Sequence, residues 1–172
     1  LRTNLESRII KTTDTRMQRV MMKAKTAPHG DEFRKACFNW ATDKTIEDDR
    51  RIPAALIVAT TGQKKIIPTL TDLFLASSDL ATMVQLAKAL QHLSTDLCSK
   101  VYPAKSMEDA ALLPSRLQAL ITAKHKQTGD VLVNILTTKT VSKSTQADAI
   151  RAYRLGLSST LNNHLTDLAP AG

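Results

Sequence analysis

The side chains that could do chemistry are few and widely spaced in this chain of 172 residues. The histidines are His29, His92, His125 and His164. None has the spacing to cysteine or carboxylate neighbours that builds a metal site. Cys37 and Cys98 form no metal pattern, and their helical, partly apolar surroundings predict reduced packing residues. We therefore expect no metal site and no cofactor.

Nucleophilic catalysis also lacks a convergent set of groups. His92 and Asp96 are four residues apart on the polar face of one predicted helix, a spacing that could orient an imidazole but is more typical of a surface hydrogen bond. Cys98 lies on the apolar face of that helix, so it could act as a nucleophile only if it became exposed. No Gly-x-Ser-x-Gly, dinucleotide or kinase signature occurs. The sequence predicts no catalytic residue and no enzyme.

A possible phosphate loop lies at residues 60–65, which read Thr-Thr-Gly-Gln-Lys-Lys. A Walker loop needs two glycines at fixed spacing before Lys-Ser/Thr, so that several backbone amides converge on phosphate. This segment has one glycine, and we reject nucleotide binding. Lys64 and Lys65 remain candidates for contacts to a nucleic-acid backbone.

The charge of the chain predicts an anionic partner. The formal net charge is +8 and the pI is about 9.7, which favours nucleic acid first and a membrane surface or an acidic protein second. The alternative is that the basic surface only aids solubility. Residues 1–25 alone hold seven basic residues against two acids. On a helical wheel, the cations there oppose a seam that includes Ile9, Met17 and Val20, so a basic ridge could follow phosphates while the seam docks on protein.

Two other interpretations of residues 1–25 stay open. A basic amphipathic helix can lie on an anionic membrane, but this one lacks the Trp and Phe that such helices prefer. It can also be an ordinary surface helix with a solvated face. Thr12, Thr13 and Thr15 lower its helix propensity, so the segment could order only on binding.

A second basic group lies between residues 139 and 154. Aromatic residues are only 3% of the chain, and Phe38 and Trp40 are expected to anchor in the core, with base stacking as the alternative. Contact should therefore be to phosphate and largely independent of sequence. The candidate nucleic-acid-binding residues are Arg8, Lys11, Arg16, Arg19, Lys23, Lys64, Lys65, Lys139, Lys143, Arg151 and Arg154.

The stretch 146–165 resembles a helix-turn-helix motif, in which Gly156 would make the turn. The residues that would then face a groove are Ser158, Thr160, Asn162 and Asn163. The apolar spacing after the glycine is off by one residue, however. We favour a single helix from residue 144 to residue 168, with Gly156 in its middle.

Apolar periodicity predicts the helices that must position these groups. The central one spans 79–101, with Asp79 as N-cap. Its predicted apolar face includes Leu80, Met83, Val84, Ala87 and Leu90. Further helices are expected at 31–42, 52–60, 68–76 and 106–126. Pro53 should lie in the first turn of the second of these, and Pro68 near the start of the third. In the fourth, Pro114 should kink or split the helix, and residues 124–126 should form its last turn. Helix and strand stay open alternatives for 53–60 and 129–138.

The composition predicts an all-α fold, because hydrophobic residues make up 42% and only five glycines are present. We expect a single-domain orthogonal or irregular bundle of about six to eight helices, with a basic N-terminal helix that can project from it. The predicted division is 1–27, a basic amphipathic helix or arm, and 28–172, the bundle. No apolar run approaches a membrane span and no secretory signal occurs, so we expect no membrane contact and an intracellular or virion location. Since the chain begins at Leu1, a processed product or a fragment is expected.

The expected function is non-catalytic binding of an RNA or DNA backbone, as a small or repeated subunit of a nucleoprotein assembly such as a capsid, a ribonucleoprotein or an effector complex. The alternative is a helical interaction or oligomerisation module with no nucleic-acid role. In that case the seam of Ile9, Met17 and Val20 would dock on another protein or a second copy, and the basic ridge would face water. Self-association or a partner protein is expected in addition to the nucleic acid.

Overall fold

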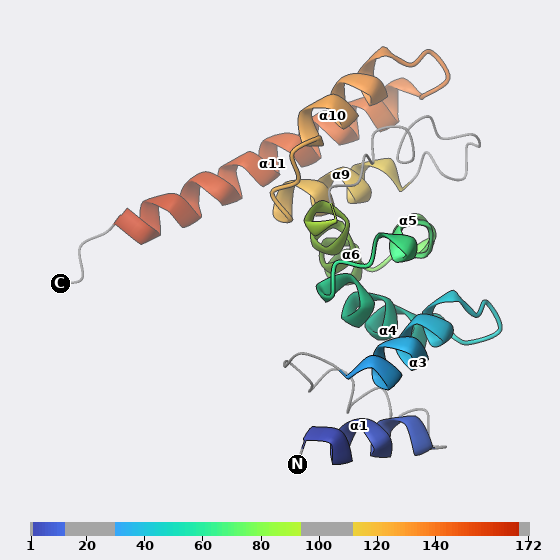
Figure 1. Ribbon diagram of the computed structural model, residues 1–172. Coiled ribbons are helices and arrows are strands. Elements are labelled where there is room, and N and C mark those ends of the chain that lie inside the picture. Colours follow the sequence, from blue (N-terminus) through green and yellow to red (C-terminus); the bar gives the residue numbers. More distant parts are fainter. Residues whose placement is uncertain (1, 13–29, 94–111, 169–172) are drawn as a thin grey trace.

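The computed structural model describes residues 2–12, 30–93 and 112–168, with 2–5 and 157–168 as helical backbone only (Figure 1). Within these ranges the chain forms eight α-helices and one 3-10 helix, and no strand. The elements are α1 (Arg2–Lys11), α3 (Asp31–Thr42), α4 (Asp48–Thr60), η1 (Lys64–Ile66), α5 (Ile67–Ala76), α6 (Leu80–His92), α9 (Leu113–Thr122), α10 (Thr128–Thr137) and α11 (Lys143–Leu168). The predicted all-α bundle of six to eight helices is confirmed.

Both runs for which helix and strand were open are helical. Residues 53–60 belong to α4, and nearly all of 129–138 belongs to α10. The β-branched residues of α10 follow helical spacing, because Val131 and Ile135 are buried one turn apart while Val133 between them is exposed. The burial of one side of α10 therefore shows that this segment is a helix, which the short apolar run in the sequence could not distinguish from a strand.

The helices stack in the order of the chain, with α1 at one end and α10 and α11 at the other (Figure 1). The main contacts run from α1 to α3, α3 to α4, α4 to α6, α6 to α9 and α9 to α11. The helices α5 and α10 pack beside this series, α5 against α4 and α6, and α10 against α9 and α11. The distal part of α11 extends away from the stack (Figure 1).

Helix α6 begins as predicted, because the Asp79 carboxylate accepts from the backbone N–H of Thr82 at 2.7 Å. Residues 94–101 of the predicted helix lie outside the described residues, and α6 itself ends at His92, before the predicted end at residue 101. Its buried residues are Met83, Leu86, Ala87 and Leu90. The prediction for Leu80 is wrong: this side chain is 44% exposed, because the first residue of α6 lies beyond the edge of the buried stripe.

Two predicted helix boundaries are also wrong. Helix α4 begins at Asp48, so Pro53 lies inside the helix and not in its first turn. The polar residues that precede it form the first turn. There the Arg51 guanidinium donates to the Asp48 carboxylate at 2.7 Å and to the Ala41 carbonyl at 3.2 Å. Helix α9 ends at Thr122, so residues 124–126 follow the helix. Lys124, at φ 55°, and His125 close the helix end with N–H bonds to Ile121 and Leu120 carbonyls at 2.9 and 2.8 Å.

The prolines at the other helix starts sit where proline costs little. Pro68 lies in the first turn of α5, as predicted, and Pro114 lies in the first turn of α9. The part of the predicted 106–126 helix that precedes Leu112 is outside the described residues. Arg116, on α9, is buried and donates to the Leu75 carbonyl at 2.5 Å, which places a cation at the C-terminal end of α5.

Helix α11 runs without a break through Gly156, so the helix-turn-helix motif is not formed and the single helix is confirmed. Gly156 is buried against α9. A Cβ atom at this position would lie 2.4 Å from Cγ2 and 2.9 Å from Cδ1 of Ile121. The glycine therefore lets the backbone of α11 approach the end of α9 closely.

Replacing Gly156 with alanine should destabilise the protein by about 1–3 kcal/mol, because the added methyl group overlaps Ile121. The matched control is Gly129→Ala in α10, where a Cβ meets nothing within 4 Å; it should be neutral or stabilising by up to about 1 kcal/mol. Urea denaturation followed by circular dichroism measures both. Equal effects of the two substitutions would contradict the close packing of α11 on α9.

The capping role of Asp79 predicts a pH dependence. The pKa of Asp79 lies below its usual 3.8, because Thr82 donates to the carboxylate from its side chain and its backbone N–H. This stabilisation is present above pH 4 and is lost as the pH falls through the lowered pKa. Asp79→Ala should therefore unfold at lower urea concentration than wild type at pH 7, and the difference should shrink below pH 4. For Asp79→Asn, which keeps a cap without a charge, we expect a smaller loss at pH 7. A difference that grows on acidification would refute the cap.

Candidate nucleic-acid interface

Eight of the predicted site residues lie in the described chain, and all eight are exposed: Arg8, Lys11, Lys64, Lys65, Lys139, Lys143, Arg151 and Arg154. Arg16, Arg19 and Lys23 lie outside the described residues. Of the eight, only Arg151 has a carboxylate partner in the described structure, Asp148 at 3.0 Å. Both of these side chains are more than half exposed, so water screens the pair and leaves the arginine accessible.

Helix α1 joins the bundle through one side and shows cations on the other. Ile9 is fully buried in the core next to α3, whereas Arg8 and Lys11 face solvent. The Glu6 carboxylate accepts from the backbone N–H of Gly30, at 3.1 and 3.2 Å to its two oxygens, and so fixes α1 to the start of α3. The described part of the basic ridge is therefore backed by an apolar contact within the same chain. The proposed boundary between 1–27 and 28–172 lies outside the described residues and stays a prediction.

The middle of the chain is electrically balanced. Residues 30–93 contain eight Lys or Arg and eight Asp or Glu, and several pair locally, as Arg34 does with Asp31. The Arg50 guanidinium lies 4.7 Å from the centroid of the Trp40 ring. Phe33 meets the same ring edge-on, with centroids 6.5 Å apart. Because Arg50 covers the Trp40 ring, a base could stack there only by displacing it.

The excess charge of the described chain lies mainly in its C-terminal part. Residues 112–156 hold seven Lys or Arg against two Asp. On α11, Lys143, Arg151 and Arg154 fall within about 80° of one another, opposite the side buried on α9. At 1.5 Å per residue they span about 16 Å along the helix axis. A polyanion that lies along α11 would meet all three cations.

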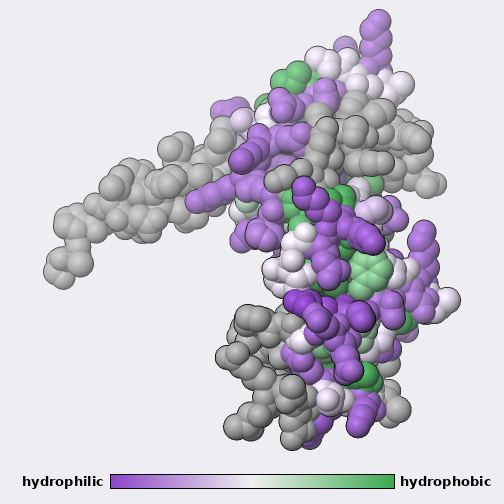
Figure 2. All heavy atoms as spheres, viewed as in Figure 1, coloured by the Kyte–Doolittle hydropathy of each residue, from purple (hydrophilic) through white to green (hydrophobic). Residues whose placement is uncertain are grey.

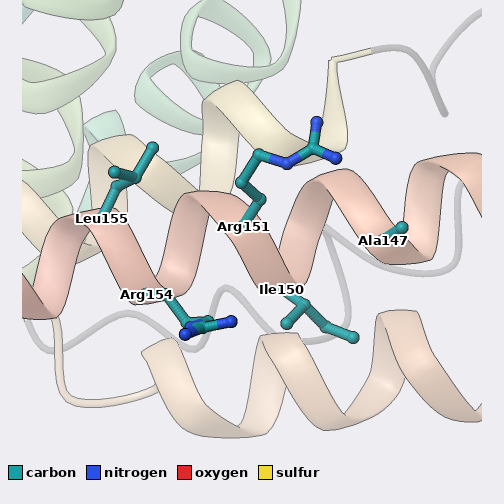
Figure 3. Close-up of a pocket in the computed structure, with 5 residues that line it drawn as sticks. All are labelled: Ala147, Ile150, Arg151, Arg154 and Leu155. Carbon is teal, nitrogen blue, oxygen red and sulfur yellow. The ribbon is translucent and has the colours of Figure 1, made fainter.

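The exposed side of α11 also contains a surface hollow of about 470 Å³. The described residues that line it are Ala147, Ile150, Arg151, Arg154 and Leu155. In Figure 3, Ile150 and Arg154 lie on one flank of the helix, and Arg151 and Leu155 lie on the other. Hydrophilic residues cover most of the described surface in Figure 2, with smaller apolar patches between them.

Sequence reasoning missed the exposure of Ile150 and Leu155. A signal was present, because on a helical wheel both residues share the side of Arg151 and Arg154, opposite the small residues Ala149 and Gly156. Small residues mark the side of a helix where another backbone can approach. The large apolar residues opposite them were therefore candidates for exposure.

The groups that could carry catalysis are not assembled into a site in the described chain. Cys37 is buried, and this burial is the main reason why the pKa of its thiol is raised to about 12. The negative charge of nearby Glu6 is the second, smaller cause. His125 is buried, and its Nδ1 accepts from the Gln127 N–H at 3.3 Å. His92 is exposed on α6, and Asp96 is outside the described residues. The expectation of a non-catalytic protein stays a prediction.

The described residues contain no group of three or more metal-ligating side chains that could hold an ion. No helix among them has the length and apolar character needed to cross a membrane.

Comparison with known proteins adds no family: neither a protein-family model, nor a curated protein, nor a solved structure matches this chain.

The raised pKa of Cys37 predicts slow reaction with thiol reagents. In a Cys98→Ser variant at pH 8, about one Cys37 thiol in ten thousand would be ionised in the folded protein, so labelling with iodoacetamide should follow the rate of unfolding. Glu6→Gln should change this rate little unless it destabilises the fold, since burial is the larger cause of the raised pKa. Labelling of the folded protein as fast as that of urea-unfolded protein would contradict a buried thiol.

Proposed function

We propose that this protein is a non-catalytic helical protein that binds the backbone of RNA or DNA, as a subunit of a nucleoprotein assembly. The observation that carries the proposal is that the candidate cations are exposed to solvent and that most of them have no carboxylate partner in the described chain. The eight described candidate residues are all exposed, and seven of them have no carboxylate partner within the described chain. A phosphate could therefore approach them without first breaking an ion pair.

The helical framework favours contact with phosphates over contact with bases. The cations on α11 project from one side of a helix that is held at Gly156, and those on α1 project from a helix that is held by Ile9 and Glu6. Phosphate contacts need positive charge at fixed positions and carry no sequence information. The covered face of Trp40 leaves little aromatic surface for stacking. We therefore expect binding that depends little on base sequence and strongly on salt.

The alternative, an interaction module that docks through the seam of Ile9, Met17 and Val20, has less support. Ile9 is fully buried in the core of its own chain, so it is not available to a partner while α1 stays packed. Met17 and Val20 lie outside the described residues. The large apolar residues that are exposed in the described chain are Ile10, Leu80, Val133, Leu136, Ile150 and Leu155, and two of these, Ile150 and Leu155, lie on α11 beside arginines.

Charge reversal on α11 tests the proposed function. The variant Lys143→Glu, Arg151→Glu, Arg154→Glu should bind heteropolymeric RNA or duplex DNA at least about tenfold more weakly than wild type at 0.1 M salt. The slope of log affinity against log salt should fall by about two on single-stranded RNA and by about three on duplex DNA, because three phosphate contacts are lost. Fluorescence anisotropy in a salt titration measures both quantities.

The matched control reverses three exposed lysines in the balanced middle of the chain, Lys35→Glu, Lys44→Glu and Lys88→Glu. It changes the net charge by the same amount but leaves α11 intact. Two results would exclude the proposal: an affinity that hardly changes between low and moderate salt, or equal losses in the two variants.

A further inference from the structure

The exposed side of α11 combines arginines with large apolar residues. Ile150 is 43% exposed and Leu155 is 63% exposed. Each lies one helical turn from an arginine, Ile150 beside Arg154 and Leu155 beside Arg151 (Figure 3). Binding to a phosphate backbone gives no reason for either apolar residue to be exposed.

A second hollow extends this surface across the neighbouring helices. Its volume is about 270 Å³, and it shares Arg151 and Leu155 with the first. On its other sides it is lined by Leu80 at the start of α6, by Pro114, Ser115 and Gln118 of α9, and by Asp148 and Ala152 of α11. The Asp148 carboxylate pairs with Arg151, and this exposed pair can be exchanged for a carboxylate of a partner. We call the two hollows together the α11 groove, which contains the exposed apolar residues Leu80, Ile150 and Leu155 and the arginines Arg151 and Arg154.

We propose that the α11 groove is a docking site for an acidic amphipathic helix of a partner protein. Such a helix presents apolar anchors at spacings of three and four residues, which can contact Ile150, Leu155 and Leu80 while its Asp or Glu residues pair with the arginines. Arginine beside exposed apolar surface is typical of protein interfaces. This docking site does not depend on nucleic-acid binding.

The charges and the exposed apolar residues together favour this occupant over the other two. Residues 112–156 expose six Lys or Arg, since Arg116 is buried, against two Asp, so the partner that complements them is acidic. A second copy in a two-fold contact would bring its own Arg151 and Arg154 against this surface, which is electrostatically unfavourable. A nucleic acid would pair with the arginines but would bury little of Ile150 and Leu155.

The experiment uses a fluorescein-labelled helical peptide of about 14 residues, with leucines along one face and glutamates on the other. Fluorescence anisotropy should give a Kd of about 10–100 µM for wild type. The groove variant Ile150→Ser, Leu155→Ser should bind at least about tenfold more weakly. The matched control is Val133→Ser, Leu136→Ser, which removes exposed apolar residues from the neighbouring α10 and should bind within about twofold of wild type. Circular dichroism and thermal melts check that both variants fold.

A scrambled peptide of the same composition, which cannot form the apolar face, separates docking from simple charge attraction. Equal binding of the two peptides, or an unchanged Kd in the groove variant, overturns the proposal. A dimer that is present in wild type and absent in the groove variant would assign the groove to a second copy and also overturn it. Loss of RNA binding in a folded groove variant would assign the groove to nucleic acid. The proposed function has its own test, the salt titration and the charge reversal described above, and the groove variant keeps all three α11 cations on which that test depends.

Discussion

The close contact between Gly156 and Ile121 is the constraint on which the proposed binding surface of α11 depends. Because Gly156 has no side chain, the backbone of α11 packs directly on the Ile121 side chain at the end of α9. Ala149, two turns earlier on the same side, is also fully buried. The opposite side, with Lys143, Arg151 and Arg154, must then face solvent. The same contact leaves Ile150 and Leu155 exposed, so this helix packing fixes the positions of both the proposed phosphate-binding residues and the proposed docking groove.

Much of the fold could be predicted from local signals. Asp79 capped its helix as its position implied, and Pro68 marked a helix start. The predicted helix boundaries were wrong where a helix begins or ends with residues that are unusual for that position. Pro53 was placed at a helix start because prolines usually lie there, whereas four polar residues formed the first turn before it. The end of α9 was missed because lysine, and not glycine, adopts the left-handed conformation at residue 124.

The candidate site could be predicted only in part. Lysine and arginine are rarely buried, so their exposure follows from their type. Among the described residues Arg116 is the exception, and its guanidinium donates to the Leu75 carbonyl at the end of α5. Which cations lack a carboxylate partner depends on neighbours brought together by folding, as when Arg51 pairs with Asp48 while Arg154 stays unpaired in the described chain. The equal numbers of cations and acids in residues 30–93 can be counted in the sequence. That this balanced segment lies between two basic ends of the molecule is known only from the structure, which places α1 and α11 at opposite ends of the stack (Figure 1).

The order of the helices in the stack has a consequence for how the protein loses its structure. Since the main contacts join helices that are close in the chain, the coupling between distant helices must pass through those between them. Cooperativity should then weaken with distance along the stack. Loosening of the junction of α9 and α11 should therefore increase local opening most in α10 and α11 and least in the α3–α4 pair.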